Sequence, residues 1–203
     1  MKLTVIGGSQ GTGADVAELA GRAGHEVTVV SRSGRAPAGA RVVTGSATDP
    51  EVARRAVDGA DAVVVTVGGA KGVRRQRTEV TRAVVDAMSA TGARRLVVQS
   101  SLGAGDSGSQ LPLPLRLLMK VVLAAPLADH EAQESVVRGS GLDWTIIRPT
   151  GLTNAPGTGR WRAHEVGDGG RLGGTIPRAD LAAYLLEVVS DDSLVRRAVG
   201  VSS

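Results

Sequence analysis

The chain has 203 residues, of which 24 are Lys or Arg and 20 are Asp or Glu, so it carries a net charge of +4 and can bury one substantial core. It has no cysteine, which excludes disulfides, thiol nucleophiles and thiolate metal sites. The pI of about 10.3 comes from arginines spread along the chain, and only three residues are aromatic, so we expect no nucleic-acid partner.

The N-terminal segment is typical of a strand, a glycine-rich turn, a helix and a second strand. Leu3 to Ile6 is an apolar run that predicts a buried strand. A helical pattern follows from Thr12 to Ala23 and ends at Gly24, and Glu26 to Val30 predicts the next strand. This order within about 30 residues indicates a βαβ unit.

The glycines of the turn indicate a dinucleotide-binding site. Gly8 and Gly13 have the spacing of an ATPase phosphate loop, but Ala14-Asp15 replaces the Lys and Ser or Thr that such a loop needs. Gly7, Gly11 and Gly13 instead give G-x-x-x-G-x-G, which suits a close approach of backbone to pyrophosphate at a helix N-terminus. A tight turn without a ligand is the alternative. The expected cofactor-binding residues of the turn are Gly7, Ser9, Gln10, Gly11, Thr12 and Gly13.

The end of the second strand indicates which dinucleotide binds. An NAD site places an acidic residue about 20 residues after the glycines, to hold the ribose 2′-hydroxyl. This chain has Arg32 and Arg35 there, with Ser31 and Ser33 as hydroxyl donors. Guanidinium groups suit a 2′-phosphate, so we expect NADP(H) to be preferred over NAD(H). A solvated basic loop is the alternative.

The alternation of strands and helices continues without a linker. Further strands are expected at 41–44, 61–67, 95–99 and 143–148, and a last edge strand at 198–202. Helices are expected at 50–57 with Asp49 as N-cap, around Val80 to Met88, and from Pro177 to Val189. The pattern predicts one α/β Rossmann domain over residues 1–203, with a doubly wound, mostly parallel sheet and helices on both faces. Cofactor contacts are also expected where strands end, at Ser46, Val67, Gly68, Ser100, Pro149 and Thr150.

The most apolar segment, Leu111 to Leu127, is shorter than the about 20 residues that a membrane span needs, and it contains Arg116 and Lys120. We therefore expect no membrane span. The segment is expected to form a helix that walls the substrate site, or else an ordinary core or dimer helix. Met1-Lys2 leads directly into the first strand without a signal-peptide pattern, so a cytoplasmic location is expected.

Three segments carry a family resemblance: "VIGGSQGTG...GHEVTVVSR", "LVVQSS" and "EAQESVVRGSGLDWTIIRPTGLT". With them the chain resembles the atypical short-chain dehydrogenase/reductase superfamily, and within it the small NAD(P)H-binding proteins related to biliverdin IXβ reductase/flavin reductase and the NmrA-like group. The resemblance implies a strand order of about 3-2-1-4-5-6-7. It also implies a substrate site formed by loops and helices at about 100–128 and 149–176, and a monomer or homodimer.

The chain departs from this superfamily at two places. Gln10 stands where the atypical relatives have their middle glycine. Classical short-chain dehydrogenases/reductases use a Tyr-x-x-x-Lys pair to pass a proton to the substrate, but here Pro126 and His130 occupy the Tyr and Lys positions. The single tyrosine, Tyr184, lies near the C-terminus with no lysine after it. The tyrosine mechanism is therefore not expected.

Two candidate catalytic residues remain. The resemblance implies that Ser101 hydrogen-bonds the substrate oxygen, although a strand-end hydroxyl can also cap backbone. His130 is expected to bind the nicotinamide ribose or to donate a proton near neutral pH, or else to be a surface histidine. His25 and His164 have no partner pattern, so no metal site is expected.

The sequence favours an NADPH-dependent oxidoreductase that reduces a flavin-like, quinone-like or conjugated small molecule. Such acceptors delocalise charge, so they need little acid help from the protein. Two alternatives stay open: an NmrA-like protein that binds NAD(P) as a sensor without turnover, and an isomerase or cyclase on the same fold.

Overall fold

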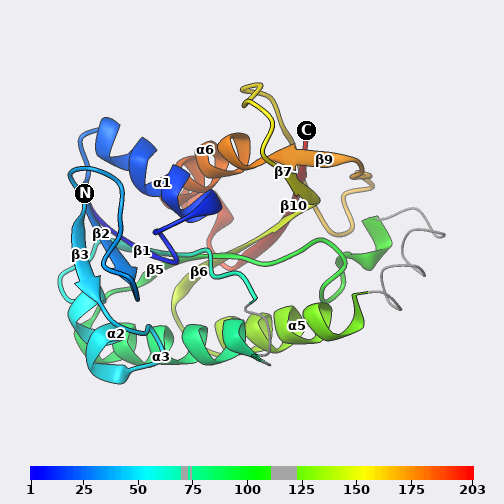
Figure 1. The fold of residues 1–203 in the computed structure, drawn as a ribbon. Helices are drawn as coiled ribbons and strands as arrows, with labels where there is room; N and C mark the ends of the chain where they lie inside the picture. Colours follow the sequence, from blue (N-terminus) through cyan, green and yellow to red (C-terminus); the bar gives the residue numbers. More distant parts are fainter. Residues whose placement is uncertain (70–72, 74, 111–122) are drawn as a thin grey trace.

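The computed structural model describes residues 1–69, 73, 75–110 and 123–203, which form one α/β domain (Figure 1). Its main sheet has the order β3-β2-β1-β4-β5-β6-β10-β8, so the predicted Rossmann order is confirmed over its first seven strands. All neighbouring pairs are parallel except β10 and β8. The strands are β1 (Lys2–Ile6), β2 (Glu26–Ser31), β3 (Arg41–Thr44), β4 (Ala62–Val65), β5 (Arg95–Gln99), β6 (Asp143–Pro149), β8 (Arg162–Glu165) and β10 (Arg197–Ser202).

Helices cover both faces of the sheet, as predicted (Figure 1). On one face α1 (Gly11–Arg22) packs against α6 (Arg178–Val189). On the other face α3 (Gln76–Thr91) packs between α2 (Pro50–Val57) and α5 (Ala124–Arg138). Short 3-10 helices occupy Ser107–Gln110 and Asp192–Leu194.

Strand β4 shows why the central strands are almost wholly apolar. Val63 and Val65 belong to the core under α2, α3 and α5, whereas Ala62 and Val64 belong to the core under α1 and α6. All four side chains are buried, because helices cover a parallel sheet on both faces. Burial on both faces holds the carboxyl ends of β1, β4 and β5 in fixed positions relative to one another.

The C-terminal part corrects the sequence analysis in two respects. Strand β10 is not an edge strand, because β8 pairs antiparallel with it, with Val199 opposite Glu165. The sequence of β8, Arg-Ala-His-Glu, is largely polar and therefore gives no strand signal. A second small sheet joins β7 (Gly151–Thr153) to β9 (Thr175–Pro177). Of the expected helix at Leu111 to Leu127, residues 111–122 lie outside the described part, and α5 begins at Ala124.

Candidate functional site

A cavity of about 880 Å³ lies at the carboxyl ends of the central strands. Its lining runs from the glycine turn, past the ends of β4 and β5, to the segment after β6. Both segments expected to form the substrate site contribute residues to it, among them Leu102, Leu123 and Leu152. Four residues expected near the cofactor do not line this cavity: Gly13, Ser31, Ser33 and Arg35. The other expected residues all line it, and they are Gly7, Ser9, Gln10, Gly11, Thr12, Arg32, Ser46, Val67, Gly68, Ser100, Ser101, His130, Pro149 and Thr150.

The glycine turn has the backbone geometry that its sequence predicts. Gly7 and Gly11 have φ angles of +90° and +56°, which favour glycine. A Cβ added at Gly13 would lie 2.3 Å from the Gly7 carbonyl oxygen and 2.4 Å from Thr66 Oγ1. Gly13 therefore holds α1 tightly against the turn and the end of β4, which explains why it does not itself line the cavity.

The N-terminus of α1 opens into the cavity. Its first residues, Gly11 and Thr12, line the space, and its N-cap residue Gln10 makes no side-chain capping bond. The first turn carries no acidic residue. The first backbone N–H groups of a helix lack partners within the helix, so this end suits an anion.

Charge in the cavity favours an anionic ligand. Among the described residues, its lining includes Arg32, Arg77 and Arg178 but no Asp or Glu. Arg32 is exposed at the rim just after β2, and Ser46 lines the space after β3. Ser31 is buried, with its Oγ 3.3 Å from that of Ser33. No carboxylate stands where an NAD-specific site would need one.

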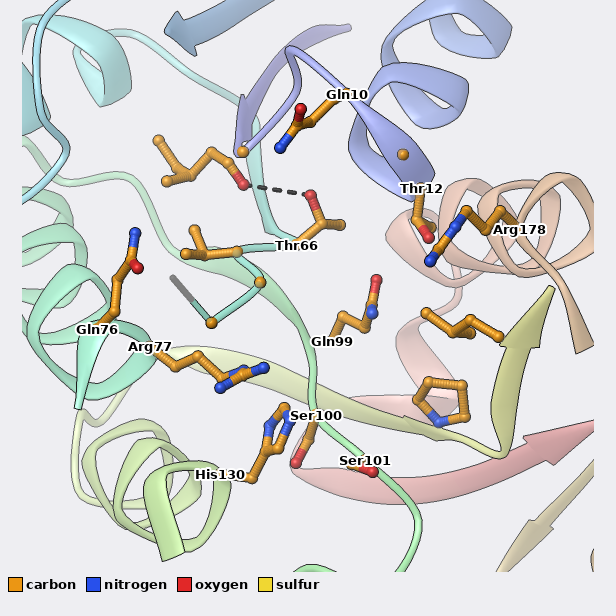
Figure 2. A pocket seen from close by; sticks show the side chains of 18 of the residues that line it. Gln10, Thr12, Thr66, Gln76, Arg77, Gln99, Ser100, Ser101, His130 and Arg178 are labelled. Carbon is orange, nitrogen blue, oxygen red and sulfur yellow. Dashed lines mark hydrogen bonds between the residues drawn. The ribbon is translucent and has the colours of Figure 1, made fainter. Parts of the chain in front are cut away.

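Arg178, the first residue of α6, was missed by the sequence analysis. Its Nε donates to Asn154 Oδ1 at 3.0 Å, and its Cδ lies 4.0 Å from the position that a Cβ on Gly11 would take. Figure 2 shows its guanidinium pointing toward Thr12. The side chain thus lies over the open end of α1, although the two segments lie near opposite ends of the chain. No local pattern indicates this contact.

Several polar atoms in the cavity wall have no hydrogen-bond partner within the described part of the chain. The buried ones that line the cavity are Thr12 Oγ1, Gln76 Oε1, Arg77 Nε, Gln99 Oε1 and Thr150 Oγ1. Buried polar groups in folded proteins are nearly always hydrogen-bonded. Their number around one cavity indicates that a polar ligand completes them.

The two serines after β5 differ in how firmly hydrogen bonds hold their hydroxyl groups. Ser100 is buried and its Oγ donates to Glu134 Oε1 at 2.7 Å. Ser101 is half-buried, and its Oγ makes only a 3.2 Å bond to the Leu102 carbonyl oxygen. Ser101 is therefore the serine whose hydroxyl can turn toward a ligand.

His130 is not the surface histidine that the sequence left open. It is buried in α5, and burial, followed by the charge of Arg77, lowers its pKa to about 4. Its Nδ1 lies 3.3 Å from Gln133 Oε1, while Gln133 Nε2 donates to Thr81. The ring is thus neutral at neutral pH and its Nδ1 is the donor, which leaves Nε2 as an acceptor. A neutral ring can accept a bond from a ribose hydroxyl but is a poor acid.

A buried ion-pair network supports the serine loop. Arg148 is fully buried, and its guanidinium donates to both oxygens of Glu134, at 2.9 and 2.6 Å. It also reaches Asp106 at 2.7 Å. A Cβ added at Gly105 would lie 2.6 Å from Arg148 Nη2, so the loop passes directly over the guanidinium. Through Glu134 this network holds Ser100 and thereby the backbone of Ser101.

A family model described as NAD(P)H-binding matches residues 7–192. The chain belongs to this NAD(P)H-binding family. The match covers the glycine turn, both serines and α6, and it includes every residue that lines the cavity except Ile6. The unpartnered polar atoms, the open end of α1 and the three arginines fit the polar, anionic cofactor of this family.

Individual proteins extend the comparison. The chain is 27% identical to ChuY from Escherichia coli O157:H7, described as an anaerobillin reductase, with a TM-score of 0.84 over 99% of this chain and 96% of that one. It is 28% identical over 154 residues to YhfK of Bacillus subtilis, described as an uncharacterized sugar epimerase, and 34% identical over 108 residues to a UPF0659 protein of Schizosaccharomyces pombe. These matches cover 73% and 46% of this chain, and 66% and 42% of the two relatives' own lengths.

Other groups in the chain lie apart from the cofactor site of this NAD(P)H-binding protein. Tyr184 is buried against Trp161 and does not line the cavity, and burial, followed by the charge of Glu187, raises its pKa to about 12. Within the described ranges, no group of three or more His, Asp or Glu side chains could hold a metal ion. None of the helices described is long and apolar enough to cross a membrane.

Proposed function

We propose that this protein is an NADPH-dependent reductase of a conjugated small molecule, such as a flavin-like or quinone-like acceptor. One observation carries the proposal: a single cavity connects the anion-binding end of α1 with Ser101 and His130, leaving room for an acceptor beside the cofactor. The likeness to ChuY, described as an anaerobillin reductase, supports a reductase.

In this proposal, one group of residues binds the phosphates of the cofactor and a second group orients the acceptor and the nicotinamide ribose. The turn, the N-terminus of α1 and Arg178 hold the pyrophosphate, and Arg32 with Ser46 holds the 2′-phosphate. When bound, the reduced nicotinamide supplies a hydride from C4. Ser101 donates a hydrogen bond to the acceptor, and neutral His130 accepts one from the nicotinamide ribose. Water supplies the proton that a tyrosine supplies elsewhere in the superfamily.

Arg32→Ala is expected to weaken NADPH binding at least tenfold and to leave NADH binding unchanged. Charge-assisted hydrogen bonds to the 2′-phosphate contribute about 1.5–3 kcal/mol, and NADH lacks that phosphate. Calorimetric titration of both cofactors measures the difference. Arg55→Ala, which removes an exposed arginine on α2 away from the cavity, is the control. Equal affinity of the wild-type protein for NADPH and NADH would contradict the cofactor preference.

The reaction itself is tested by following NADPH oxidation at about 340 nm, where NADPH absorbs and NADP⁺ does not, against blanks that contain each acceptor without the protein. The acceptors are free flavins, quinones and anaerobillin, each added to the wild-type protein. Turnover of at least one acceptor supports the reductase. Tight NADPH binding without oxidation by any acceptor would instead favour the sensor function.

Ser101→Ala is expected to lower kcat by about ten- to a hundredfold, because one hydrogen bond to developing charge is lost. This range lies below the roughly 10²–10³-fold loss of kcat that follows removal of a full oxyanion-hole donor. Tyr184→Phe is the control and should leave turnover unchanged, since Tyr184 is buried outside the cavity. An inactive but folded Tyr184→Phe variant would contradict the mechanism without tyrosine.

A further inference from the structure

Arg77 lies in the wall of the cavity, at the start of α3. Its guanidinium is drawn near His130 and Ser100 in Figure 2, on the side away from Arg178. Its side chain is 16% exposed, so it faces the cavity rather than bulk solvent. Nothing in the sequence pattern marks it, because it is one of 21 arginines when the three lysines are taken from the 24 basic residues.

Asp129 fixes the position of Arg77. The Asp129 carboxylate accepts the backbone N–H of Arg77 at 3.1 Å and its Nη1 at 3.3 Å, and it also binds the amide and hydroxyl of Thr78. Asp129 therefore fixes the first turn of α3. Arg77 Nε is buried and has no hydrogen-bond partner in the described part of the chain, so Asp129 does not use every donor of the guanidinium.

The surrounding wall is built around this guanidinium. A Cβ added at Gly69 would lie 3.0 Å from Arg77 Nη1, so a residue with a side chain would press on the charged group. The Lys position of the superfamily holds His130, whose ring is neutral and whose lowered pKa is due in part to Arg77. The cationic side chain at this end of the cavity thus comes from α3, where it is paired with the Asp129 carboxylate of α5 at 3.3 Å, and not from the Lys position on α5.

We propose that Arg77 contacts the acceptor and stabilises the negative charge that forms on it during reduction. This inference rests on the proposed reductase function. A hydride that reaches an electrophilic carbon of a conjugated acceptor displaces a π-electron pair onto an oxygen or nitrogen of that acceptor. The acceptor is then an anion, NADPH has become NADP⁺, and a proton from water neutralises the anion. Arg77 provides the positive charge for that anion before the proton arrives.

The test compares Arg77→Gln, which removes the charge, with Arg77→Lys, which keeps it. Arg82→Gln is the matched control, because Arg82 lies on the same helix but is exposed and outside the cavity. We expect Arg77→Gln to lower kcat and kcat/KM equally, by about a hundredfold, as for an interaction made only in the transition state. Arg77→Lys should recover activity to within about tenfold of wild type.

Two further measurements, one of NADPH binding and one of the pKa of His130, separate a role in charge stabilisation from a role in structure. Calorimetric NADPH affinity should change less than about threefold in Arg77→Gln, since the phosphate-binding end of the cavity is untouched. NMR titration should show the pKa of His130 rising in Arg77→Gln but not in Arg82→Gln, because a nearby positive charge has been removed. A raised KM with unchanged kcat, or activity equal to wild type, would overturn the proposal. Absence of wild-type turnover with every acceptor would refute the reductase function and this role with it.

Discussion

Gly13→Val is expected to abolish NADPH binding and to destabilise the fold. The added Cβ would meet the Gly7 carbonyl oxygen at 2.3 Å and Thr66 Oγ1 at 2.4 Å, and backbone atoms cannot rotate away as a flexible side chain can. Helix α1 would have to move off β1 and β4, taking its N-terminus out of the cavity. Overpacking of this kind costs about 1–3 kcal/mol of folding free energy. The sequence pattern alone predicts that Gly13→Val loses binding but keeps the fold largely intact. The two short distances in the structure change that expectation, because they predict a loss of stability as well.

Gly21→Val is the matched control, since Gly21 is on the same helix and nothing lies within 4 Å of an added Cβ. Urea unfolding and calorimetric titration should find it close to wild type in both stability and NADPH affinity. Normal NADPH binding by Gly13→Val would show that the turn does not position the pyrophosphate.

Glu134→Gln is expected to destabilise the protein by about 3 kcal/mol, because it leaves the fully buried Arg148 without its main counter-charge. Asp106 remains as a partner at 2.7 Å, but its side chain is 64% exposed, which limits the compensation. The loss falls on the loop that carries Ser101, so NADPH turnover should fall as well. Urea unfolding measures the free energy of unfolding.

Glu131→Gln, an exposed neighbour on α5, controls for the substitution itself. Replacing both partners, as Glu134→Leu with Arg148→Met, should recover most of the stability, since an apolar pair of similar volume needs no counter-charge. If the single variant were as stable as wild type, the ion pair would not be what holds the loop.

The sequence predicts those parts of the fold that follow from local patterns. The strands β1, β2, β4, β5 and β6 are apolar runs, and Asp49 caps α2 through a 2.9 Å bond to the Glu51 amide, as its position before Pro50 indicates. Strand β8 cannot be predicted from its own residues, because it is polar and is held as a strand by its antiparallel pairing with β10.

The same distinction applies to the candidate site. The glycine turn and Arg32 can be singled out from the sequence because each follows an apolar strand at the spacing of a dinucleotide-binding motif. Arg77 and Arg178 lie in the first turns of α3 and α6, where no ligand-binding pattern marks either arginine, and Ser100 meets Glu134 across 34 positions of the chain. These contacts arise from the packing of α3, α5 and α6 on the sheet, so only the folded chain reveals them.

The make-up of the cavity wall also determines how its charge responds to acidity. Its described residues include no carboxylate, its one histidine has a pKa of about 4, and arginines stay protonated well above neutrality. The wall therefore keeps the same charge from about pH 5 to pH 9. A phosphate monoester changes its charge near pH 6, within that range. A change in NADPH affinity near pH 6 is therefore expected to come from the 2′-phosphate and not from a side chain of this wall.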